Sequence, residues 1–380
     1  MTAESARREI EGDGGEDPRY LGEQLITYIG NKRALLSPIR EAIEDVAARV
    51  GRPRLHMLDA FSGSGVVSRL MKRYAKRLVV NDFEEYAAVI SRCYLANREE
   101  VSIGCVEEAA SRIQEEYSLL RDGPRGFIER LYAPPNEGHI EAGDRVFYTR
   151  DNARRLDFFR QAIEREALEW RDHLLGPLLS EASIHANTAG VFKGFYKDRR
   201  TGIGQFGGSG RDALSRITAP IVLRSAVLSR YSCETQVLQA DANELPRLCG
   251  GFDLAYIDPP YNQHPYGSNY FMLNLLVAYE EPATVSRVSG IPTGWRRSQY
   301  NQRRTAHRSL RDLVSRIDAR FLLISYNDEG FVPIEEMREM LGAIGRVEER
   351  RLPYATFRGS RNLANRSLGV TEHLFLVEKG

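Results

Sequence analysis

Short apolar runs that end in an acidic residue recur along the chain. Two of them, LHMLDAF (55–61) and RLVVND (77–82), are each followed within a few residues by a segment whose apolar positions have helical spacing. Strands and helices that alternate over short connections are typical of a parallel sheet covered by helices. Strand-like runs return at 234–241, 252–258 and 320–328. The pattern predicts an α/β fold built on a doubly wound sheet.

Between about residues 100 and 230 the pattern changes, because no strand-like apolar run occurs there. The segments VEEAASRIQEEYSLL (106–120) and LDFFRQAIEREALEW (156–170) have helical spacing, and a glycine-rich polar stretch follows them. This change favours an insertion into the sheet-forming domain. Its length of about 130 residues is near the usual size of a domain.

We therefore expect one catalytic domain built from residues 20–100 and 234–380, interrupted by a mainly helical module at 101–233. Residues 1–17 are charged and almost without large apolar side chains, and they are predicted to be a disordered lead-in. The last two strand-like segments, GRVEERRL and TEHLFLVEK, are predicted to form a β-hairpin with a long loop.

The composition excludes several classes of protein. The chain has 380 residues, of which 42% are hydrophobic and 28% charged, as expected for a soluble globular protein. The net charge is only +1, so any surface for nucleic acid must be local. The four cysteines are scattered without a Cys-x-x-Cys pair, which fits a reducing cytoplasm and predicts no metal site. Apolar runs fall short of the ~18 residues of a membrane span.

An acidic residue closes three of the strand-like runs, namely Asp59, Asp82 and Asp241, and Asp258 opens a D-P-P-Y tetrapeptide after a fourth. The carboxyl ends of parallel strands lie at one edge of the sheet, where ligands bind in open α/β folds. Any one of these acids could be a helix N-cap, and a lone D-P-P-Y could simply stop a strand, because proline cannot continue a central one. Four such signals at one edge favour a binding site instead.

The turn after Asp59, Phe61-Ser62-Gly63-Ser64-Gly65, suits a ligand-binding loop. Glycines let the backbone turn tightly and approach a ligand, and the amides that begin the following helix favour an anionic group. Position 68 is Ser, so the third glycine of a pyrophosphate-binding motif is absent and an ordinary turn remains an alternative. In such a site Asp82 could accept hydrogen bonds from ribose hydroxyls, and Asp241 from an exocyclic amine.

Taken in order, these segments resemble the motifs of the D12 class of DNA adenine-N6 methyltransferases, which includes the Dam enzymes, over nearly all of the chain after residue 25. The resemblance implies a Rossmann-like, S-adenosylmethionine-dependent methyltransferase fold with an inserted target-recognition module. YIGNKRALL (28–36) is similar to the motif that contacts the methionine end of the cofactor in this family. As a whole the resemblance assigns the cofactor to Tyr28, Gly30, Lys32, Asp59, Phe61, Gly63, Gly65, Asp82, Asp241, Ala242 and Asp258.

The D-P-P-Y segment resembles the family's catalytic tetrapeptide, here Asp258, Pro259, Pro260 and Tyr261. An adenine amine is a poor nucleophile because its lone pair is delocalised into the ring. Hydrogen bonds to Asp258 and to the carbonyl of Pro259 would draw both N–H groups out of the ring plane, in a geometry that the prolines fix in advance. Tyr261 can stack on a base taken out of the duplex.

Other base methyltransferases fit this segment less well. A cytosine-C5 enzyme needs an activated cysteine, which usually follows a proline, and no cysteine does so here. Cytosine-N4 enzymes usually carry Ser where this chain has Asp258. The tetrapeptide therefore favours adenine.

Two basic stretches are candidates for contact with double-stranded DNA. Residues 287–311 hold seven arginines and no acid, with aromatic residues among them, and could neutralise phosphates and stack on bases. The stretch 190–208 is loosely similar to a hairpin that touches DNA in this family. A solvated loop is the alternative for both. The candidate DNA-binding residues are Lys193, Lys197, Arg199, Arg200, Trp295, Arg296, Arg297, Tyr300, Arg303 and Arg304.

The sequence therefore predicts a cytoplasmic, site-specific DNA methyltransferase that flips an adenine and methylates its N6 amine. The resemblance further implies a restriction system with a cognate restriction endonuclease as partner. One alternative is an RNA methyltransferase that uses D-P-P-Y on an exocyclic amine, although its compact members lack so long an insertion. The other is an inactive nucleic-acid-binding relative, against which the intact acids argue.

Overall fold

A seven-stranded sheet organises the first and last parts of the chain. The computed structural model describes residues 15–120, 126–208, 210–354 and 370–380, so the predicted lead-in lies mostly outside the described residues. The strand order is β3-β2-β1-β4-β5-β7-β6, and β7 is antiparallel to its two neighbours. The strands are β1 (Leu55–Asp59), β2 (Ala75–Asp82), β3 (Glu234–Gln239), β4 (Phe252–Ile257), β5 (Ala319–Asn327), β6 (Gly345–Tyr354) and β7 (Val370–Lys379). The predicted Rossmann-like α/β fold is confirmed.

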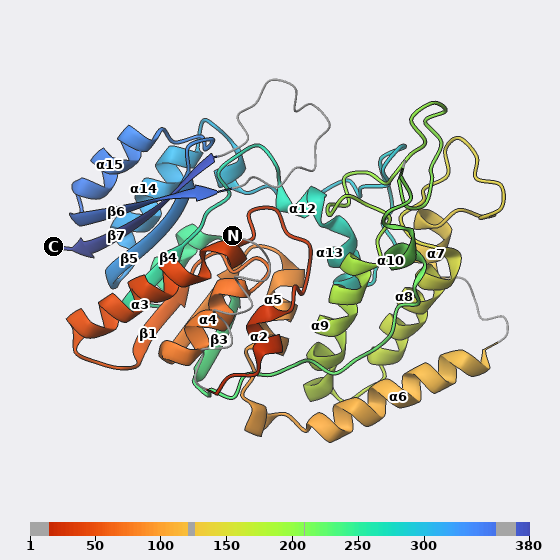
Figure 1. Ribbon diagram of the computed structural model, residues 1–380, viewed down its shortest axis with the longest axis horizontal. Coiled ribbons are helices and arrows are strands. Elements are labelled where there is room, and N and C mark those ends of the chain that lie inside the picture. Colours follow the sequence, from red (N-terminus) through yellow and green to blue (C-terminus); the bar gives the residue numbers. More distant parts are fainter. Residues whose placement is uncertain (1–14, 121–125, 209, 355–369) are drawn as a thin grey trace.

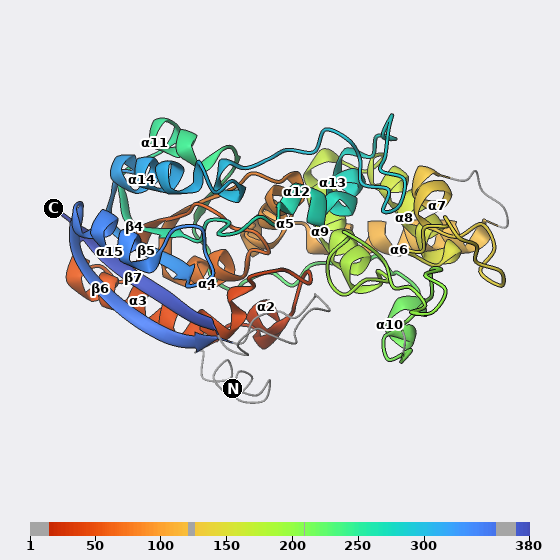
Figure 2. The ribbon, with the colours of Figure 1, turned by 90° about the horizontal axis from the view of Figure 1, so that it is seen from above.

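Helices cover both faces of this sheet (Figure 2). Alternate side chains of a strand point to opposite faces, so Leu58 packs with one buried cluster while its neighbour Met57 packs with the other. Burial on both faces explains why the strands read as continuous apolar runs rather than as alternating ones. One face is covered by α11 (Leu245–Leu248), α14 (Ala306–Arg316) and α15 (Ile334–Gly342), and the other by α3 (Leu36–Val50) and α4 (Val66–Tyr74).

A helical region lies beside the sheet, at the opposite end of the molecule from the C-terminus (Figure 1). It comprises α6 (Ile103–Leu119), α7 (Phe127–Tyr132), α8 (Arg150–Ile163), α9 (Leu168–Ile184) and α10 (Leu214–Thr218). Its core joins the sheet through α5 (Glu85–Tyr94), which packs on α9, and it also takes in α13 (Phe271–Ala278) from after the tetrapeptide. The packing of α13 assigns it to the helical core, whereas the predicted boundary at residue 233 would leave it in the catalytic domain.

The helix predicted over 156–170 is wrong in its bounds. α8 ends at Ile163, a turn follows, and α9 begins at Leu168 and continues to Ile184. A proline inside α9, Pro177, hides this second helix in the sequence, because proline usually ends a helix. The remaining short elements are α2 (Pro18–Gly22), η1 (Lys32–Leu35), η2 (Arg98–Glu100), η3 (Ala242–Glu244), α12 (Tyr266–Asn269) and η4 (Gln299–Asn301).

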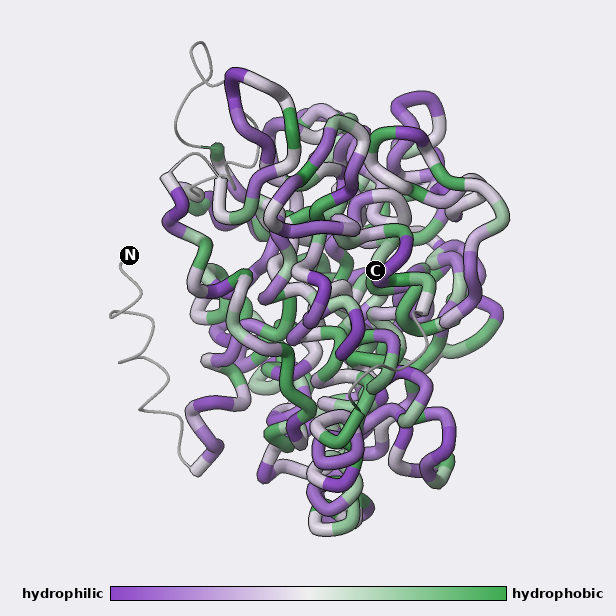
Figure 3. Tube along the Cα trace, turned by 90° about the vertical axis from the view of Figure 1, so that its right-hand side faces the viewer, coloured by the Kyte–Doolittle hydropathy of each residue, from purple (hydrophilic) through white to green (hydrophobic). Residues whose placement is uncertain are grey.

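The predicted terminal hairpin forms from β6 and β7, while its long loop lies outside the described residues. β7 enters the sheet between β5 and β6, so its first residues lie at the edge where the parallel strands end. The hydropathy of the chain follows this architecture, with hydrophilic segments at the periphery (Figure 3). None of the helices in the described ranges is long and apolar enough to cross a membrane.

Candidate active site

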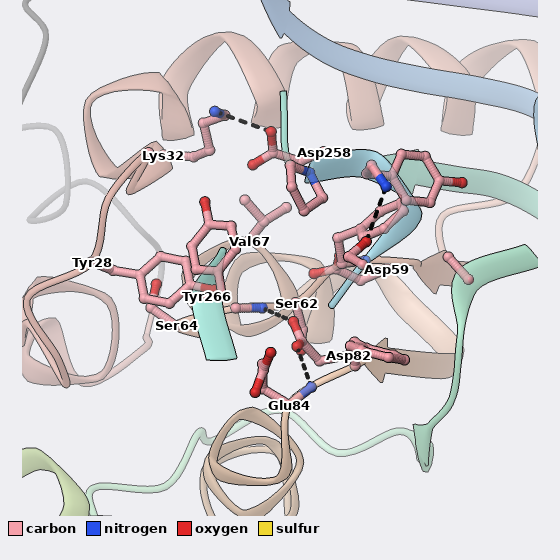
Figure 4. Close-up of a pocket in the computed structure, with 18 of the residues that line it drawn as sticks. Tyr28, Lys32, Asp59, Ser62, Ser64, Val67, Asp82, Glu84, Asp258 and Tyr266 are labelled. Carbon is pink, nitrogen blue, oxygen red and sulfur yellow. Dashed lines mark hydrogen bonds and ion pairs between the residues drawn. The ribbon is translucent and has the colours of Figure 1, made fainter. Parts of the chain in front are cut away.

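A pocket opens at the carboxyl ends of β1, β2 and β4 (Figure 4). The space between its walls, including solvent at the open mouth, is about 840 Å³. Of the predicted cofactor residues, Gly65 does not line it. Those that do are Tyr28, Gly30, Lys32, Asp59, Phe61, Gly63, Asp82, Asp241, Ala242 and Asp258. Chain segments that are far apart in the sequence thus meet at one edge of the sheet, as the acids at the ends of the strands predicted.

The glycine turn is shaped by hydrogen bonds to two of these acids. The Gly63 amide donates to Asp82 Oδ2 at 2.7 Å, and the Phe61 amide donates to Asp59 Oδ1 at 3.3 Å (Figure 4). Gly63 has φ +52°, and a Cβ there would lie 2.6 Å from the ring of Tyr28. Only glycine therefore lets the turn pass so close to that ring. Gly65 plays a different part, because its left-handed conformation begins α4.

Asp59 is held as a buried acceptor at the end of β1. Its Oδ2 accepts a hydrogen bond from Ser68 Oγ at 2.5 Å. Burial raises the pKa of Asp59 to about 7, against the opposing effect of the hydrogen bonds from Ser68 and Phe61. Ser68 occupies the place of the missing third glycine, and its hydroxyl fixes the carboxyl group at the head of the pocket.

Glu84 is a pocket residue that the sequence did not single out. It lies beside Asp82, whose Oδ1 accepts from the Glu84 amide at 2.9 Å (Figure 4). Glu84 Oε2 accepts from Asn274 Nδ2 at 2.7 Å, and burial raises the pKa of Glu84 to about 7. Burial also raises the pKa of Asp82, against the hydrogen bonds from the amides. The only signal in the sequence was its place two residues after a strand-end acid.

Two aromatic rings line another part of the pocket. The rings of Phe61 and Tyr300 meet edge to face, with centroids 5.1 Å apart, and Asp241 and Ala242 lie alongside. Tyr300 is 2% exposed and its hydroxyl donates to Asn243 Oδ1 at 2.9 Å. A ring buried in this way cannot stack on DNA, so we reassign Tyr300 from the predicted DNA surface to the pocket.

The tetrapeptide follows β4 directly, and Asp258, Pro260 and Tyr261 line the pocket while Pro259 is buried beside it. The Phe331 amide donates to the carbonyl of Tyr261 at 2.8 Å, and the Tyr261 ring meets Tyr326 edge to face. These contacts hold the segment on the end of β5.

Two further tyrosines form the wall that faces the tetrapeptide. The rings of Tyr28 and Tyr266 are stacked, with centroids 5.0 Å apart, and both line the pocket (Figure 4). The Tyr266 hydroxyl donates to the carbonyl of Ile29 at 3.2 Å. The sequence missed Tyr266, because a single tyrosine a few residues after the tetrapeptide carries no signal by itself.

A buried lysine lies behind the tetrapeptide. Lys32 is 3% exposed, and its Nζ is 3.1 Å from Asp258 Oδ1 and 3.0 Å from Glu372 Oε1. Burial alone lowers the pKa of Lys32, but the two carboxylates together raise it well above its usual value. Lys32 is therefore charged at neutral pH. Burial raises the pKa of Asp258 to about 7, with Lys32 opposing and Glu372 adding to the rise.

The stretch 190–208 contains a β-hairpin closed between Lys197 and Gly204, and the side chains of Arg199 and Arg200 are exposed near its tip. A second hairpin, paired between Val285 and Pro292, carries exposed Arg287 and was not predicted.

Both hairpins are held by one segment. Asn187 Nδ2 donates to the carbonyl of Val146 at 2.8 Å and to that of Gln205, in the first hairpin, at 3.1 Å. Arg145 Nη2 donates to the carbonyl of Ser286, in the second hairpin, at 3.3 Å. The fold thus places the 190–208 stretch and the beginning of the 287–311 stretch on the same helical region.

The remaining predicted basic residues run past the mouth of the pocket. Arg296 lies 3.8 Å from Glu85, and Arg297 stacks on Trp295. Trp295 and Arg296 line a neighbouring cavity that shares Phe83 and Glu84 with the pocket. The exposed guanidinium groups of Arg303 and Arg304 have no ion-pair partner within the described part of the chain, and Lys193 is also exposed.

Within the described residues, no group of three or more His, Cys, Asp or Glu side chains is placed to hold a metal ion.

A family model described as D12 class N6 adenine-specific DNA methyltransferase matches residues 28–340.

The chain is also similar to several curated proteins. It is 28% identical to the type II methyltransferase M.NlaIII of Neisseria lactamica over 374 residues, which cover 93% of this chain and 99% of the relative. It is 27% identical to the type II methyltransferase M.CviAII of Paramecium bursaria Chlorella virus 1, covering 93% and 98%. With the type II methyltransferase M.FokI of Planomicrobium okeanokoites the identity is 26%, over 93% of this chain and 52% of the longer relative.

Proposed function

The chain belongs to the D12 class of N6 adenine-specific DNA methyltransferases, and from that membership we propose that it methylates a flipped adenine with S-adenosylmethionine, as the modification enzyme of a restriction system. The observation that carries the proposal is that one pocket is lined both by the D-P-P-Y segment, whose Asp258 is paired with Lys32, and by the acids that follow the strands. The two curated relatives matched over nearly their whole length are both type II methyltransferases, which supports a restriction system.

The side chains of the pocket match the chemistry of S-adenosylmethionine. Asp82 and Glu84 would accept hydrogen bonds from the ribose hydroxyls, and Asp241 from the adenine amine. Phe61, Ala242 and Tyr300 would flank the adenine ring, and Tyr28, Gly30 and Lys32 would meet the methionine end. When bound, the cofactor supplies a methyl group activated on a sulfonium.

The tetrapeptide would activate the target amine. Asp258 accepts a hydrogen bond from one N–H of the adenine amine and the Pro259 carbonyl accepts from the other, which returns lone-pair density to the nitrogen. Pro259 and Pro260 fix both acceptors before the base arrives, so little ordering is needed at the moment of reaction. The exposed part of the Tyr261 ring stacks on the flipped base, worth about 1–3 kcal/mol for one stack.

The ribose assignment is tested by Asp82→Ala. The change removes an acceptor for the ribose and releases the amides of Gly63 and Glu84, so the affinity for S-adenosylmethionine should fall about tenfold to a hundredfold, or ~1–3 kcal/mol. Isothermal titration calorimetry with the cofactor measures this. Glu85→Ala, at the more exposed neighbouring position, is the matched control and should bind as the unchanged protein does. Equal affinity in both variants would remove Asp82 from the cofactor site.

DNA is proposed to lie against the exposed arginines of 287–311. Phosphate contacts position a protein without specifying bases, so Arg303→Ala combined with Arg304→Ala should weaken binding to every sequence alike. The slope of log affinity against log salt should become shallower by roughly one unit per lost contact. Titrations of a DNA library at several salt concentrations measure both quantities.

The hairpin in 190–208 is proposed to read bases. Arg199→Ala with Arg200→Ala should therefore change which sites are methylated in the same library. A shift in site preference from the Arg303 and Arg304 change, with an unaltered salt slope, would reverse these two assignments. Ribosomal RNA as a parallel substrate distinguishes the alternative RNA methyltransferase.

A further inference from the structure

Glu372 is buried directly behind the tetrapeptide, and the mechanism proposed above makes no use of it. It is 1% exposed and lies near the start of β7, opposite Asn327 at the end of β5. Because β7 is antiparallel to β5, its first residues reach the edge where Asp258 follows β4. Glu372 Oε1 accepts a hydrogen bond from Ser325 Oγ at 2.7 Å, which fixes the carboxylate in place.

Lys32 links Glu372 to Asp258. Its Nζ lies between the two carboxylates, 3.0 Å from Glu372 and 3.1 Å from Asp258. When both carboxylates are ionised, the cluster of one ammonium and two carboxylates carries a net charge of −1. Without Glu372 the lysine would neutralise Asp258 alone, and its N–H groups would compete with the target amine for the same carboxylate oxygens.

Methyl transfer brings positive charge to this cluster. The lone pair of N6 forms the new N–C bond as the C–S bond breaks and its electron pair stays on sulfur, so the positive charge passes from sulfur to the amine. One N–H proton then leaves the amine for the Asp258 carboxylate. A net negative charge beside the amine stabilises this developing charge, and inside a protein the effect is stronger than in water.

We propose that Glu372 is a positioning residue, which holds Lys32 and offsets its charge, so that an ionised Asp258 faces the target amine without being neutralised by the lysine. This inference rests on the proposed role of Asp258 in methyl transfer. In this proposal Glu372 itself does not contact the reacting amine.

The test is Glu372→Gln, which keeps the size and one acceptor oxygen but removes the charge. The single-turnover rate constant for methyl transfer at saturating DNA and cofactor should fall about tenfold to a hundredfold, the range seen when a group that supports a metal ligand is lost. DNA affinity should not change, and cofactor affinity by calorimetry should change less than the rate does, because Lys32 keeps Asp258 as a partner 3.1 Å away. Glu348→Gln is the matched control. Glu348 lies on the neighbouring strand β6 and forms an ion pair with Arg49, so the variant makes the same change of charge away from the pocket.

The pH profile separates an electrostatic role from a merely structural one. The ionisable groups that face Asp258 are Lys32, Glu372, Asp59, Tyr256, Tyr261 and Tyr266. The charge of Glu372 raises the pKa of Asp258, so in Glu372→Gln the acidic limb of the rate profile should move to lower pH. Glu372→Asp keeps the charge, and its acidic limb should stay where it is in the unchanged protein even if the shorter side chain slows transfer.

A Glu372→Gln enzyme with the unchanged rate and acidic limb, beside an inactive Asp258→Ala enzyme, would overturn the inference and leave the proposed function intact. If Glu372→Gln does not fold, Glu372→Asp and Ser325→Ala test the inference instead, because both variants keep the charge of Glu372. A shift of the acidic limb of the rate profile to lower pH in either variant would overturn the inference. A failure of the proposed function is a different result, in which the unchanged protein transfers no methyl group to adenine.

Discussion

Replacing Asp258 by alanine should abolish methyl transfer and leave cofactor binding nearly intact. The carboxylate acts on the reacting amine, so its loss falls on the transition state, and a reduction of kcat on the order of 10² to 10³ or more is expected. The fold should tolerate the change, because Lys32 keeps Glu372 as a partner 3.0 Å away. Single-turnover methylation of duplex DNA, with calorimetry of cofactor binding in parallel, measures both quantities. Near-normal turnover in this variant would refute the role given to D-P-P-Y.

The same carboxylate should give the reaction a pH dependence. Burial raises the pKa of Asp258 to about 7, and only the ionised form can accept from the amine without offering a proton of its own. The rate should therefore rise as pH rises through about 7 and be lost below it. The measurement needs saturating cofactor, because Asp59 and Glu84 in the cofactor pocket also have a pKa of about 7.

The second large effect concerns stability. Lys32→Met leaves Asp258 and Glu372 buried without their cation, and breaking a buried ion pair in this way costs about 3–5 kcal/mol. In the unchanged protein the pKa of Lys32 is raised, so its contribution to the free energy of unfolding is fully present at neutral pH. This contribution is lost only as pH rises above the ordinary range of lysine. In the variant the two carboxylates can take up protons instead, so the loss of stability should shrink as pH falls.

Urea unfolding of Lys32→Met at about pH 6 and about pH 8 measures this difference. Lys72→Met is the matched control, because Lys72 is equally buried but donates to the carbonyl of Leu95 and to Asn97 Oδ1 rather than to a carboxylate. The loss of stability in Lys72→Met should not grow with pH, because no carboxylate is left without its cation in that variant. The same loss of stability for Lys32→Met at both pH values would show that Lys32 does not neutralise the pair.

The sheet and the cofactor side of the pocket could be predicted from the sequence because their signals are local. Strand-end acids such as Asp59 and Asp82 follow directly from apolar runs, and parallel strands bring their carboxyl ends to one edge whatever lies between them. The glycine turn and D-P-P-Y are local as well, since they depend on the φ angles and missing amides of a few residues.

The residues that were missed depend on contacts between distant segments. Glu372 is one of three consecutive polar residues, 371–373, at the start of its strand, and only the antiparallel entry of β7 places it beside Lys32. Tyr300 belonged by composition to the basic stretch, but packing against Phe61 buries it. The second hairpin, at 284–293, docks on Arg145, a contact that no local pattern announces.

The proposed function depends on which atom of DNA receives the methyl group and on the residue that activates that atom. The most direct measurement is mass spectrometry of the nucleosides from unmethylated duplex DNA incubated with labelled S-adenosylmethionine and either the unchanged protein or Asp258→Ala. We predict that the label appears in N6-methyldeoxyadenosine with the unchanged protein and is absent with the variant. Label in N4-methylcytosine or 5-methylcytosine, or in N6-methyldeoxyadenosine from the variant at an undiminished rate, would contradict the account.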